Sequence, residues 1–348
     1  MIRTKAKKVV DKVLLRLYHS NHKKEATNFL KKIEAQKGKT NPKFIKLSNQ
    51  YAADVFGWVG YSPWLYVYSA ISGSFKEGWI PDNYYGKVVV PALKGQYGDL
   101  DDLNALQNKI FASKLFPDRA YYVNGLWTTA DYAVIPQKKV AEFLFKTSPK
   151  IVYKTDNSLR GLGVHFFSKD NFEINKVMAL GNGIAQQYIK QHAFFNEIVS
   201  GSVATIRLTT YIDEDGEVSL RSGFLRLGRT TDTHVKSLTH LRVPLNTETG
   251  EICKIGYDTN MHTIEKHPDS NYVFNKSIIP HFNKCIASVT NLHKLMPFSR
   301  TIGWDLIVDE NTEVKIMEWN GGHNDIKFGE ATQGPCYADL GWENLWKK

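Results

Sequence analysis

Two short strand-like segments near the C-terminus constrain this chain more than any other feature. The first, T-I-G-W-D-L-I-V, spans 301–308, and the second, K-I-M-E-W-N, spans 315–320. Both are rich in Ile, Val and Trp, which favour strands. The polar residues D-E-N-T at 309–312 predict the turn of a hairpin between them. These residues therefore predict a two-stranded antiparallel ribbon.

Oxygen-bearing side chains gather on one face of this predicted ribbon. Asp305 lies opposite Glu318, and Asn320 shares the face of Glu318, because side chains along a strand repeat every two residues. Two carboxylates this close repel each other unless a cation lies between them. Mg²⁺ prefers hard oxygen ligands with positions left for phosphate oxygens. The hairpin alone fits a magnesium site and a solvated sheet face about equally well.

Composition sets the broad class of the protein. A chain of 348 residues with 42% hydrophobic and 23% charged residues can form two or three globular domains. Its net charge of +10 points to an anionic partner: a nucleotide, an acidic saccharide, a membrane surface or a nucleic acid. The sequence contains no zinc-spaced Cys/His cluster, RNA-recognition signature or helix-turn-helix pattern, so we expect no nucleic-acid partner.

The cysteine pattern predicts a reducing compartment. The three cysteines, Cys253, Cys285 and Cys336, are odd in number and far apart, which disfavours a disulfide framework. No apolar run approaches about 18 residues, and the N-terminus lacks the apolar core of a signal peptide. We therefore expect a cytoplasmic protein.

The first 50 residues predict helix with a basic, amphipathic start. One apolar stripe consists of Val9, Val10, Val13, Leu14 and Leu17. The basic residues beside it are Lys5, Lys7, Lys8, Lys12 and Arg16. Such a helix can lie on an anionic membrane or can pack on its own domain with the basic face in water. The pattern favours the second arrangement and leaves the first open.

The rest of the chain alternates between helical and strand patterns, which predicts an α+β fold. The aromatic-rich segment 51–100 is expected to build a core, 99–111 a capped helix, and 120–135 a short strand pair. We place domain boundaries near residues 105 and 190. The expected domains are a helical, aromatic-rich one at 1–105, a glycine-loop lobe at 106–190, and a lobe with the magnesium and arginine sites at 191–348.

A glycine-bearing hairpin is predicted at 150–167. A strand ends at Lys154, a polar loop holds Gly161 and Gly163, and a second strand runs over 164–167. Backbone N–H groups of such a loop can cover phosphates, and a lysine at the strand end supplies a point charge. The segment is neither a Walker A loop nor a Rossmann fingerprint. Because glycine hairpins are common, this pattern alone favours a structural role.

A further hairpin is predicted from 202–211 and 218–227, and it places Arg207 opposite Arg226 on one face. Two opposed cations are destabilising unless an anion bridges them, which indicates a phosphate or carboxylate site. Arg229 lies close enough to join them. The alternative is that one arginine reaches solvent or pairs with a carboxylate of the protein.

In chain order these segments resemble the ATP-grasp superfamily, and most closely the sugar-transfer-associated ATP-grasp proteins of bacterial polysaccharide gene clusters. The resemblance covers about 75–335. It is carried by F-K-E-G-W-I-P at 75–81, N-K-I-F at 108–111, Q-Q-Y-I-K-Q-H at 186–192, S-V-A-T-I-R-L-T-T at 202–210, H-P-D-S-N-Y-V-F-N-K-S-I-I-P at 267–280, and I-G-W-D…M-E-W-N at 302–320. It implies two α+β lobes that clasp ATP, behind the helical N-terminal segment.

The resemblance also implies roles for individual residues. The implied ATP-binding residues are two lysines, Lys109 first and Lys154 second, and a phosphate-covering loop with Arg160, Gly161 and Gly163. An adenine-contacting linker would include Gln187 and Ile189, with His192, or alternatively Gln191, near the ribose. Catalysis would be carried by Arg207, Arg226 and Lys154, and the magnesium ligands would be Asp305, Glu318 and Asn320. One departure is the stretch 232–240, which lacks the glycine pair that the family tends to carry there.

These implications predict an ATP- and Mg²⁺-dependent carboxylate–amine ligase that works through an acyl phosphate. Its expected substrates are a uronic acid of a capsular or exopolysaccharide and an amino acid or amino sugar. Two alternatives stay open: a sugar kinase, and a nucleotide-binding accessory protein of polysaccharide assembly without activity of its own.

Overall fold

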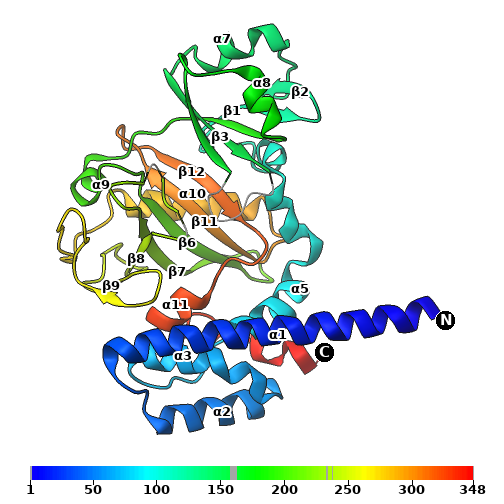
Figure 1. Cartoon of the computed structure of the whole chain (residues 1–348), viewed down its shortest axis with the longest axis vertical. Coiled ribbons are helices and arrows are strands. Elements are labelled where there is room, and N and C mark those ends of the chain that lie inside the picture. The colour runs from blue at the N-terminus through cyan, green and yellow to red at the C-terminus, as the bar shows by residue number, and fades with distance from the viewer. Residues whose placement is uncertain (1, 157–162, 233, 237, 348) are drawn as a thin grey trace. The chain divides into compact units, whose positions relative to one another are not determined.

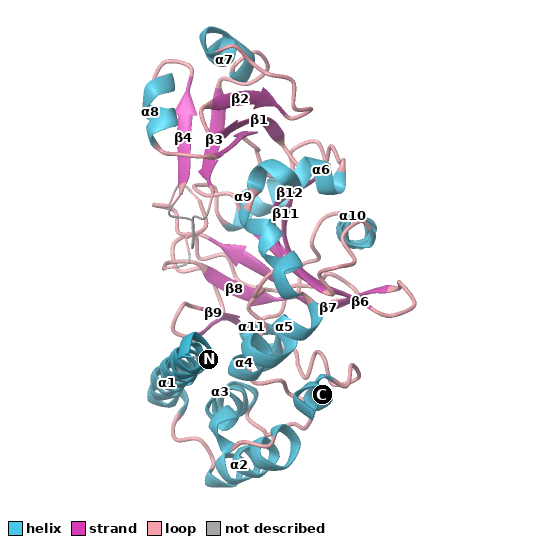
Figure 2. Ribbon diagram, turned by 90° about the vertical axis from the view of Figure 1, so that its right-hand side faces the viewer, coloured by secondary structure: helices cyan, strands magenta, loops and turns pink. Residues whose placement is uncertain are grey.

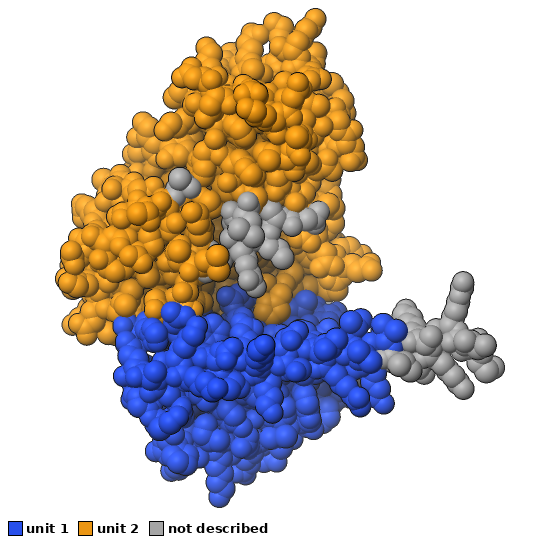
Figure 3. Space-filling view, viewed as in Figure 1, with its two compact units in different colours: residues 1–93, 260–263, 325–348 blue, residues 94–259, 264–324 orange. Residues whose placement is uncertain are grey.

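The computed structural model describes residues 2–156, 163–232, 234–236 and 238–347, with side chains from Val10 onward. Helices and strands are both present, and the α+β prediction is confirmed. The chain forms two compact units, coloured separately in Figure 3. Unit 1 comprises Met1–Leu93, Asn260–Thr263 and Asp325–Lys348, and unit 2 comprises Lys94–Thr259 and Ile264–Asn324.

Unit 1 is helical, as predicted for its first 50 residues. Its α-helices are α1 (Ile2–Lys37), α2 (Pro42–Phe56), α3 (Ser62–Ser72), α4 (Asp82–Tyr84), α5 (Val90–Leu93) and α11 (Lys327–Thr332). Shorter turns are η1 (Val59–Tyr61), the π-helical η2 (Tyr85–Val89) and η6 (Trp342–Lys347). Local signals explain the ends of α2. The Asn41 side chain accepts a hydrogen bond from the Lys43 N–H, and Gly57 ends the helix in the left-handed conformation.

Aromatic side chains build the core of unit 1, as the sequence predicted for part of 51–100. Trp64 and Tyr68 of α3 are fully buried, and so is Trp342 from the C-terminal turn. Trp58 and Tyr97 of this segment are exposed instead, at 43% and 58%. The C-terminal residues therefore complete a core that the N-terminal helices begin.

Unit 2 contains a small antiparallel sheet of five strands in the order β2-β1-β5-β3-β4. The strands are β1 (Asp118–Val123), β2 (Leu126–Thr129), β3 (Lys150–Thr155), β4 (Val164–Ser168) and β5 (Gly183–Gln187). The helices α7 (Val140–Leu144) and α8 (Ile174–Ala179) lie beside it in Figure 2. Ile151 and Tyr153 pack in the core with Val177 of α8, so Lys154 projects from the opposite face.

The second sheet has the strand order β10-β9-β8-β7-β6-β11-β12. Its strands are β6 (Thr205–Ile212), β7 (Val218–Leu227), β8 (Leu241–Pro244), β9 (Gly256–Tyr257), β10 (Thr263–Ile264), β11 (Thr301–Val308) and β12 (Val314–Asn320). Helix α10 (Phe282–Lys294) packs against β6, β7 and β11, and α9 (Ala193–Ile198) precedes the sheet (Figure 1). Both predicted hairpins, β6–β7 and β11–β12, are present.

Strand alternation divides the central strands of this sheet into a core face and a polar face. Leu208 and Trp304 point into the core, where Leu292 of α10 joins them. Arg207 and Asp305, one residue along each strand, point to the other face. The apolar residues thus fix which face of the sheet presents the charged groups.

The prediction of one continuous helix over 99–111 is wrong. The segment consists of η3 (Gly95–Asp102), η4 (Asn104–Leu106) and α6 (Gln107–Phe111), interrupted at Leu103 with φ −103° and ψ 73°. Tertiary contacts explain the tight turns. The Asp101 carboxylate accepts hydrogen bonds from the backbone N–H groups of Gly321 (2.8 Å) and Gly322 (3.3 Å). This segment is therefore fastened to the end of β12.

Candidate functional site

A pocket of about 510 Å³ lies within unit 2. Its walls include residues of β3 and β4 in the small sheet, and of β6, β7, β11 and β12 in the large sheet. A further wall comes from 99–104. This volume falls in the range of about 300–1,000 Å³ that is typical of small-molecule sites. Of the predicted residues, Lys154, Ile189, Arg207, Arg226, Asp305, Glu318 and Asn320 line it.

The hairpin β11–β12 carries the predicted oxygen donors in the predicted register. Asp305 pairs with Glu318, and Asn320 pairs with Gly303. A β-bulge follows Asp305, so that Met317 has no partner on β11. The carbonyl oxygen of Met317 accepts a hydrogen bond of 2.7 Å from the Lys154 Nζ. The bulge thus links the large sheet to the lysine of the small sheet.

The predicted pairing of the two arginines is shifted by two residues. Arg226 lies opposite Thr205, and Arg207 lies opposite Phe224. Beside the turn, Ile212 pairs with Val218, three residues from the partner that the predicted register gives it. A bulge between Thr209 and Thr210 then reduces this difference to two residues, and neither effect can be counted from the turn residues. Because Thr205 and Arg207 are two residues apart, the arginines still share one sheet face, as predicted, but diagonally.

The anion that bridges these arginines is Asp305 itself. Arg207 donates from Nε to Oδ1 (2.7 Å) and from Nη2 to Oδ2 (2.8 Å), and Arg226 donates from Nη1 to Oδ2 (2.7 Å). Burial would raise the pKa of Asp305, but the two guanidinium groups outweigh it and hold that pKa well below its usual range. Asp305 therefore stays ionised, and the two arginines balance the negative charge of this carboxylate, which is one of the two that face each other across the hairpin.

Glu318 is the carboxylate left open to the pocket. In the described part of the chain it has no hydrogen-bond or ion-pair partner. The surrounding walls limit its hydration, and this effect, with the charge of Asp305 added to it, raises the pKa of Glu318. Lys154 opposes that shift. Such an unpaired carboxylate is poised to meet a cation.

The donor set around Glu318 fits Mg²⁺. A carboxylate offers about four lone-pair positions, of which three on Asp305 are occupied by the arginines. Asn320 donates through Nδ2 to the Gly303 carbonyl (3.1 Å), which leaves its Oδ1 as an acceptor. No three His, Cys, Asp or Glu side chains converge on a metal-sized site among the described residues. A magnesium ion here would be held by Glu318, Asn320 and the remaining position on Asp305, with ligands from outside the protein completing its coordination.

Lys154 lies deep in the same pocket. Burial lowers its pKa, and the neighbouring carboxylates Glu318, Asp118 and Asp305 offset part of that effect. The carboxylate of Asp118 is in turn held by hydrogen bonds from Gln107 and Gln186. The lysine ammonium therefore lies near three carboxylates and offers a point charge to an anionic group in the pocket.

The residues of the predicted adenine linker are divided between two places. Ile189 lines the pocket, whereas Gln187 is exposed at the end of β5. His192 lines a neighbouring pocket of about 420 Å³ and caps α9 by accepting a hydrogen bond from the Phe194 N–H. Gln191, the alternative ribose contact, is buried and bonds to Asn196, Val199 and Ala204. Of these four residues, Ile189 alone lines the first pocket, and Gln191 and His192 line the neighbouring one.

Of the predicted phosphate-loop residues, Gly163 alone is described, and the first ATP lysine, Lys109, lies away from the pocket. Arg160 and Gly161 lie outside the described residues. Gly163 is buried, and its carbonyl accepts a hydrogen bond from the Thr155 N–H (3.0 Å). Lys109 is exposed on α6, with its Nζ 4.3 Å from the centre of the Tyr132 ring, and it is not among the pocket-lining residues.

Sequence reasoning missed the acidic wall of the pocket. Asp99, Asp101 and Asp102 all line it. Burial raises the pKa of Asp101 to about 6, although the N–H groups of Gly322 and Gly321 act against the shift. The signal in the sequence was three aspartates within four residues of a strongly basic chain. Their proximity to β12 could not be read from it.

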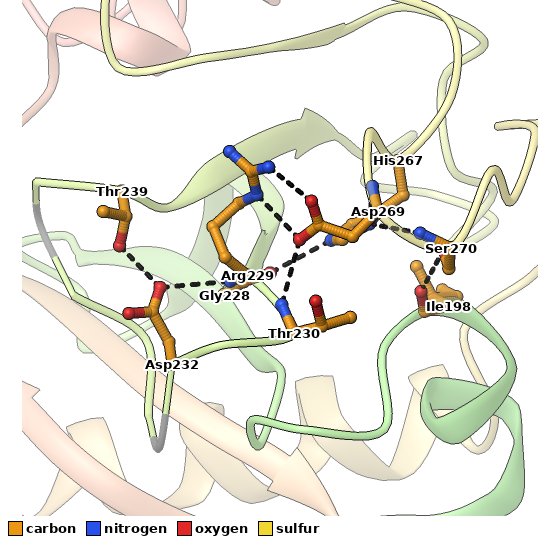
Figure 4. A network of polar contacts seen from close by, with 9 residues as sticks. All are labelled: Ile198, Gly228, Arg229, Thr230, Asp232, Thr239, His267, Asp269 and Ser270. Atoms are coloured by element: carbon orange, nitrogen blue, oxygen red, sulfur yellow. Dashed lines mark hydrogen bonds and ion pairs between the residues drawn. The ribbon is translucent and has the colours of Figure 1, made fainter.

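The segment 228–240, where the family's glycine pair is missing, is anchored by a polar network (Figure 4). Arg229 does not join Arg207 and Arg226 as predicted; its Nε donates to Asp269 Oδ2 (2.8 Å), and Nη2 contacts Oδ1. The Asp232 carboxylate accepts hydrogen bonds from the Arg229 N–H (3.2 Å) and the Thr239 hydroxyl (2.6 Å). His234, between these anchors, lines the pocket.

A family comparison decides what kind of protein carries this pocket. The model of the sugar-transfer associated ATP-grasp family matches residues 91–335. The chain belongs to this ATP-grasp family. The predicted fold and the predicted family are both confirmed, and the match includes every residue proposed for the site. A search of curated protein sequences finds no match.

Solved ATP-grasp structures resemble the chain only distantly. N5-carboxyaminoimidazole ribonucleotide synthetase with ADP is 12% identical, with a TM-score of 0.38 over 63% of this chain and 44% of that one. The ATP-grasp ligase PsnB with its minimal precursor is 10% identical (TM-score 0.39, 73% and 62%). D-alanyl-alanine synthetase A from Vibrio cholerae is 11% identical (TM-score 0.43, 76% and 74%). The matched part spans less than two thirds of the first two proteins.

Proposed function

We propose that this ATP-grasp protein binds ATP and Mg²⁺ in the pocket of unit 2 and joins a carboxylate to an amine through an acyl phosphate. The observation that carries the proposal is the convergence of Lys154, Arg207, Arg226 and Asp305 on the unpaired carboxylate of Glu318. Cationic and acidic groups in one pocket suit phosphoryl transfer, in which the phosphoryl group passes from the leaving oxygen to the attacking oxygen.

The proposed mechanism begins with ATP along the small sheet. Lys154 contacts the phosphates as a point charge, and the loop that includes Arg160, Gly161 and Gly163 covers them. Ile189 contacts the adenine, with Gln187 and His192 beside it, and Lys109 approaches from the small-sheet lobe. Glu318, Asn320 and the remaining position on Asp305 would hold the magnesium ion. When bound, the ion offsets the charge of the phosphates.

Arg207 and Arg226 position the acid and its products. An oxygen of the substrate carboxylate attacks the γ-phosphorus of ATP, so that ADP leaves and an acyl phosphate forms. The amine then attacks the acyl carbon, inorganic phosphate leaves, and an amide remains. The two guanidinium groups are held in place by Asp305 before substrate arrives, and such preorganised cations stabilise charge that develops in the transition state.

We propose a uronic acid of a capsular or exopolysaccharide as the carboxylate substrate, and an amino acid or amino sugar as the amine, in the cytoplasm. The acidic wall of the pocket supports an amine as the second substrate. Asp99 and Asp102 are exposed carboxylates at the edge of the pocket, where an ammonium group of the incoming amine would be attracted.

The first test is magnesium-dependent release of ADP from ATP across uronic acids crossed with amino acids and amino sugars. We expect turnover only when acid and amine are both present. Asp305→Asn is expected to abolish it, because the arginines lose their counterion. The matched control is Asp215→Asn, an exposed aspartate on the β6–β7 turn, which is expected to retain activity.

Other outcomes would replace the proposal. ADP release with a sugar alone, and a stable phosphorylated product, would make the protein a sugar kinase. ATP binding by calorimetry with no turnover across the panel would indicate a nucleotide-binding accessory protein. Melting curves of both variants separate lost activity from lost folding.

A further inference from the structure

The first half of α1 exposes a row of apolar side chains. Val10, Val13, Leu14 and Leu17 expose 55%, 49%, 57% and 54% of their surface. They recur at helical spacing and form one stripe about 12 Å long, at 1.5 Å per residue. The sequence favoured a helix packed on its own domain, and for these described residues that expectation is wrong. Aliphatic side chains clustered in this way on a surface indicate an interaction site.

The second half of the same helix is firmly anchored in unit 1. The ring of His19 lies 4.6 Å from that of Trp58, and Trp64 donates from Nε1 to His22 Nδ1 (3.1 Å). Ala26 and Ile33 are buried. Figure 1 shows the N-terminal end of α1 extending past the other helices of unit 1. The apolar stripe is therefore presented on a rigid support.

Charge identifies the partner of this stripe. The first 24 residues contain eight Lys and Arg and one Asp, which is +7 of the net +10 of the chain. Lys12 and Arg16 are exposed on the side of the helix opposite the stripe. A second copy of the chain would bring the same positive charge and be repelled. A stripe of two turns is also small beside the roughly 800 Å² per partner of a stable protein interface.

We propose that the first half of α1 lies in the surface of an anionic lipid bilayer, with Val10, Val13, Leu14 and Leu17 inserted among the acyl chains. Helices with one apolar stripe and a basic polar face bind in this way, and their binding depends on anionic lipid. Among the residues that the structure describes, no helix is long and apolar enough to cross a membrane.

The test is flotation of the full chain with vesicles of phosphatidylcholine alone or with added phosphatidylglycerol. We expect the protein to float with the anionic vesicles and to be released at about 1 M salt, where screening is short-ranged. The triple variant Val13→Gln/Leu14→Gln/Leu17→Gln and the double variant Lys12→Glu/Arg16→Glu are each expected to lower the bound-to-free ratio at least about tenfold. Glutamine is a good helix former, so the first variant keeps α1.

The matched control is Val134→Gln/Leu295→Gln, which removes apolar side chains that are equally exposed elsewhere, and it should float like the wild type. Equal binding by the wild type and the triple variant would overturn the proposal. So would light scattering that shows a dimer in the wild type and a monomer in the triple variant without vesicle binding. Failure of the ligase assay leaves this test untouched.

Discussion

At the scale of single residues, the site rests on an asymmetry between two facing carboxylates. The Asp305 carboxylate forms ion pairs with Arg207 and Arg226, and these hold its pKa low. Glu318, directly across the hairpin, has no partner among the described residues, and its pKa is raised. Two carboxylates that face each other across the hairpin therefore differ in state: Asp305 is a fixed anion held by arginines, and Glu318 is unpaired among the described residues.

Glu318→Gln tests this division. We expect kcat for ADP release to fall by about two to three orders of magnitude, the usual cost of removing a preorganised charge. Because the pKa of Glu318 is raised, wild-type kcat/KM should decline as pH falls through that raised value and the carboxylate takes up a proton. The residual activity of the variant should lack this decline. Glu214→Gln, on an exposed turn, should reproduce the wild-type pH profile.

At the scale of elements, close backbone packing brings the acidic segment to the pocket. Gly98 of η3 approaches the end of β12, and a Cβ built on it would lie 2.9 Å from the carbonyl oxygen of Gly321. Gly322, one residue further, has no atom within 3.9 Å of its own added Cβ. Only the first of these glycines is required by the approach of the two segments.

Gly98→Ala should therefore destabilise the protein by about 1–3 kcal/mol, the usual range for overpacking against atoms that cannot move aside. Gly322→Ala should change stability little. Urea titrations of both variants measure this difference. Equal midpoints for the two would contradict the close approach, and with it the placement of Asp99 and Asp101 beside β12.

At the scale of the whole molecule, the chain returns at its C-terminus to complete unit 1. Glu330 of α11 is fully buried, and its carboxylate accepts hydrogen bonds from the N–H groups of Ile80 and Cys336 (2.7 Å each). Burial raises its pKa from 4.5 to about 7, despite these two hydrogen bonds. The contact between these distant segments therefore depends on the protonation state of Glu330.

This coupling predicts how stability depends on pH. The folded pKa of Glu330 lies above the unfolded value, so its contribution is complete below pH 4.5 and is lost as pH rises to about 7. Glu330→Gln should flatten the fall of melting temperature over this window, and Glu77→Gln, an exposed site in unit 1, should not. A variant that keeps the wild-type slope would show that Glu330 does not carry the effect.

Features that depend on neighbouring residues could be predicted from the sequence. The turn residues of the β11–β12 hairpin placed Asp305 opposite Glu318. The period of two along a strand set Arg207 and Arg226 on one face, although their register was predicted two residues off. The order of the motifs along the chain indicated the family. The ligand roles of these residues, and of Lys109, Arg160 and Gly161, stay predictions.

The tertiary structure alone decided which of these groups meet across long sequence distances. Arg207 and Asp305 are joined because β6 pairs with β11, and Asp101 reaches Gly321 because η3 docks on β12. Bulges after Thr209 and Asp305 moved the registers, and the anchoring of α1 by its second half exposed the stripe of its first. These contacts depend on how apolar faces pack together, and the local periodicity of a sequence does not predict which faces will meet.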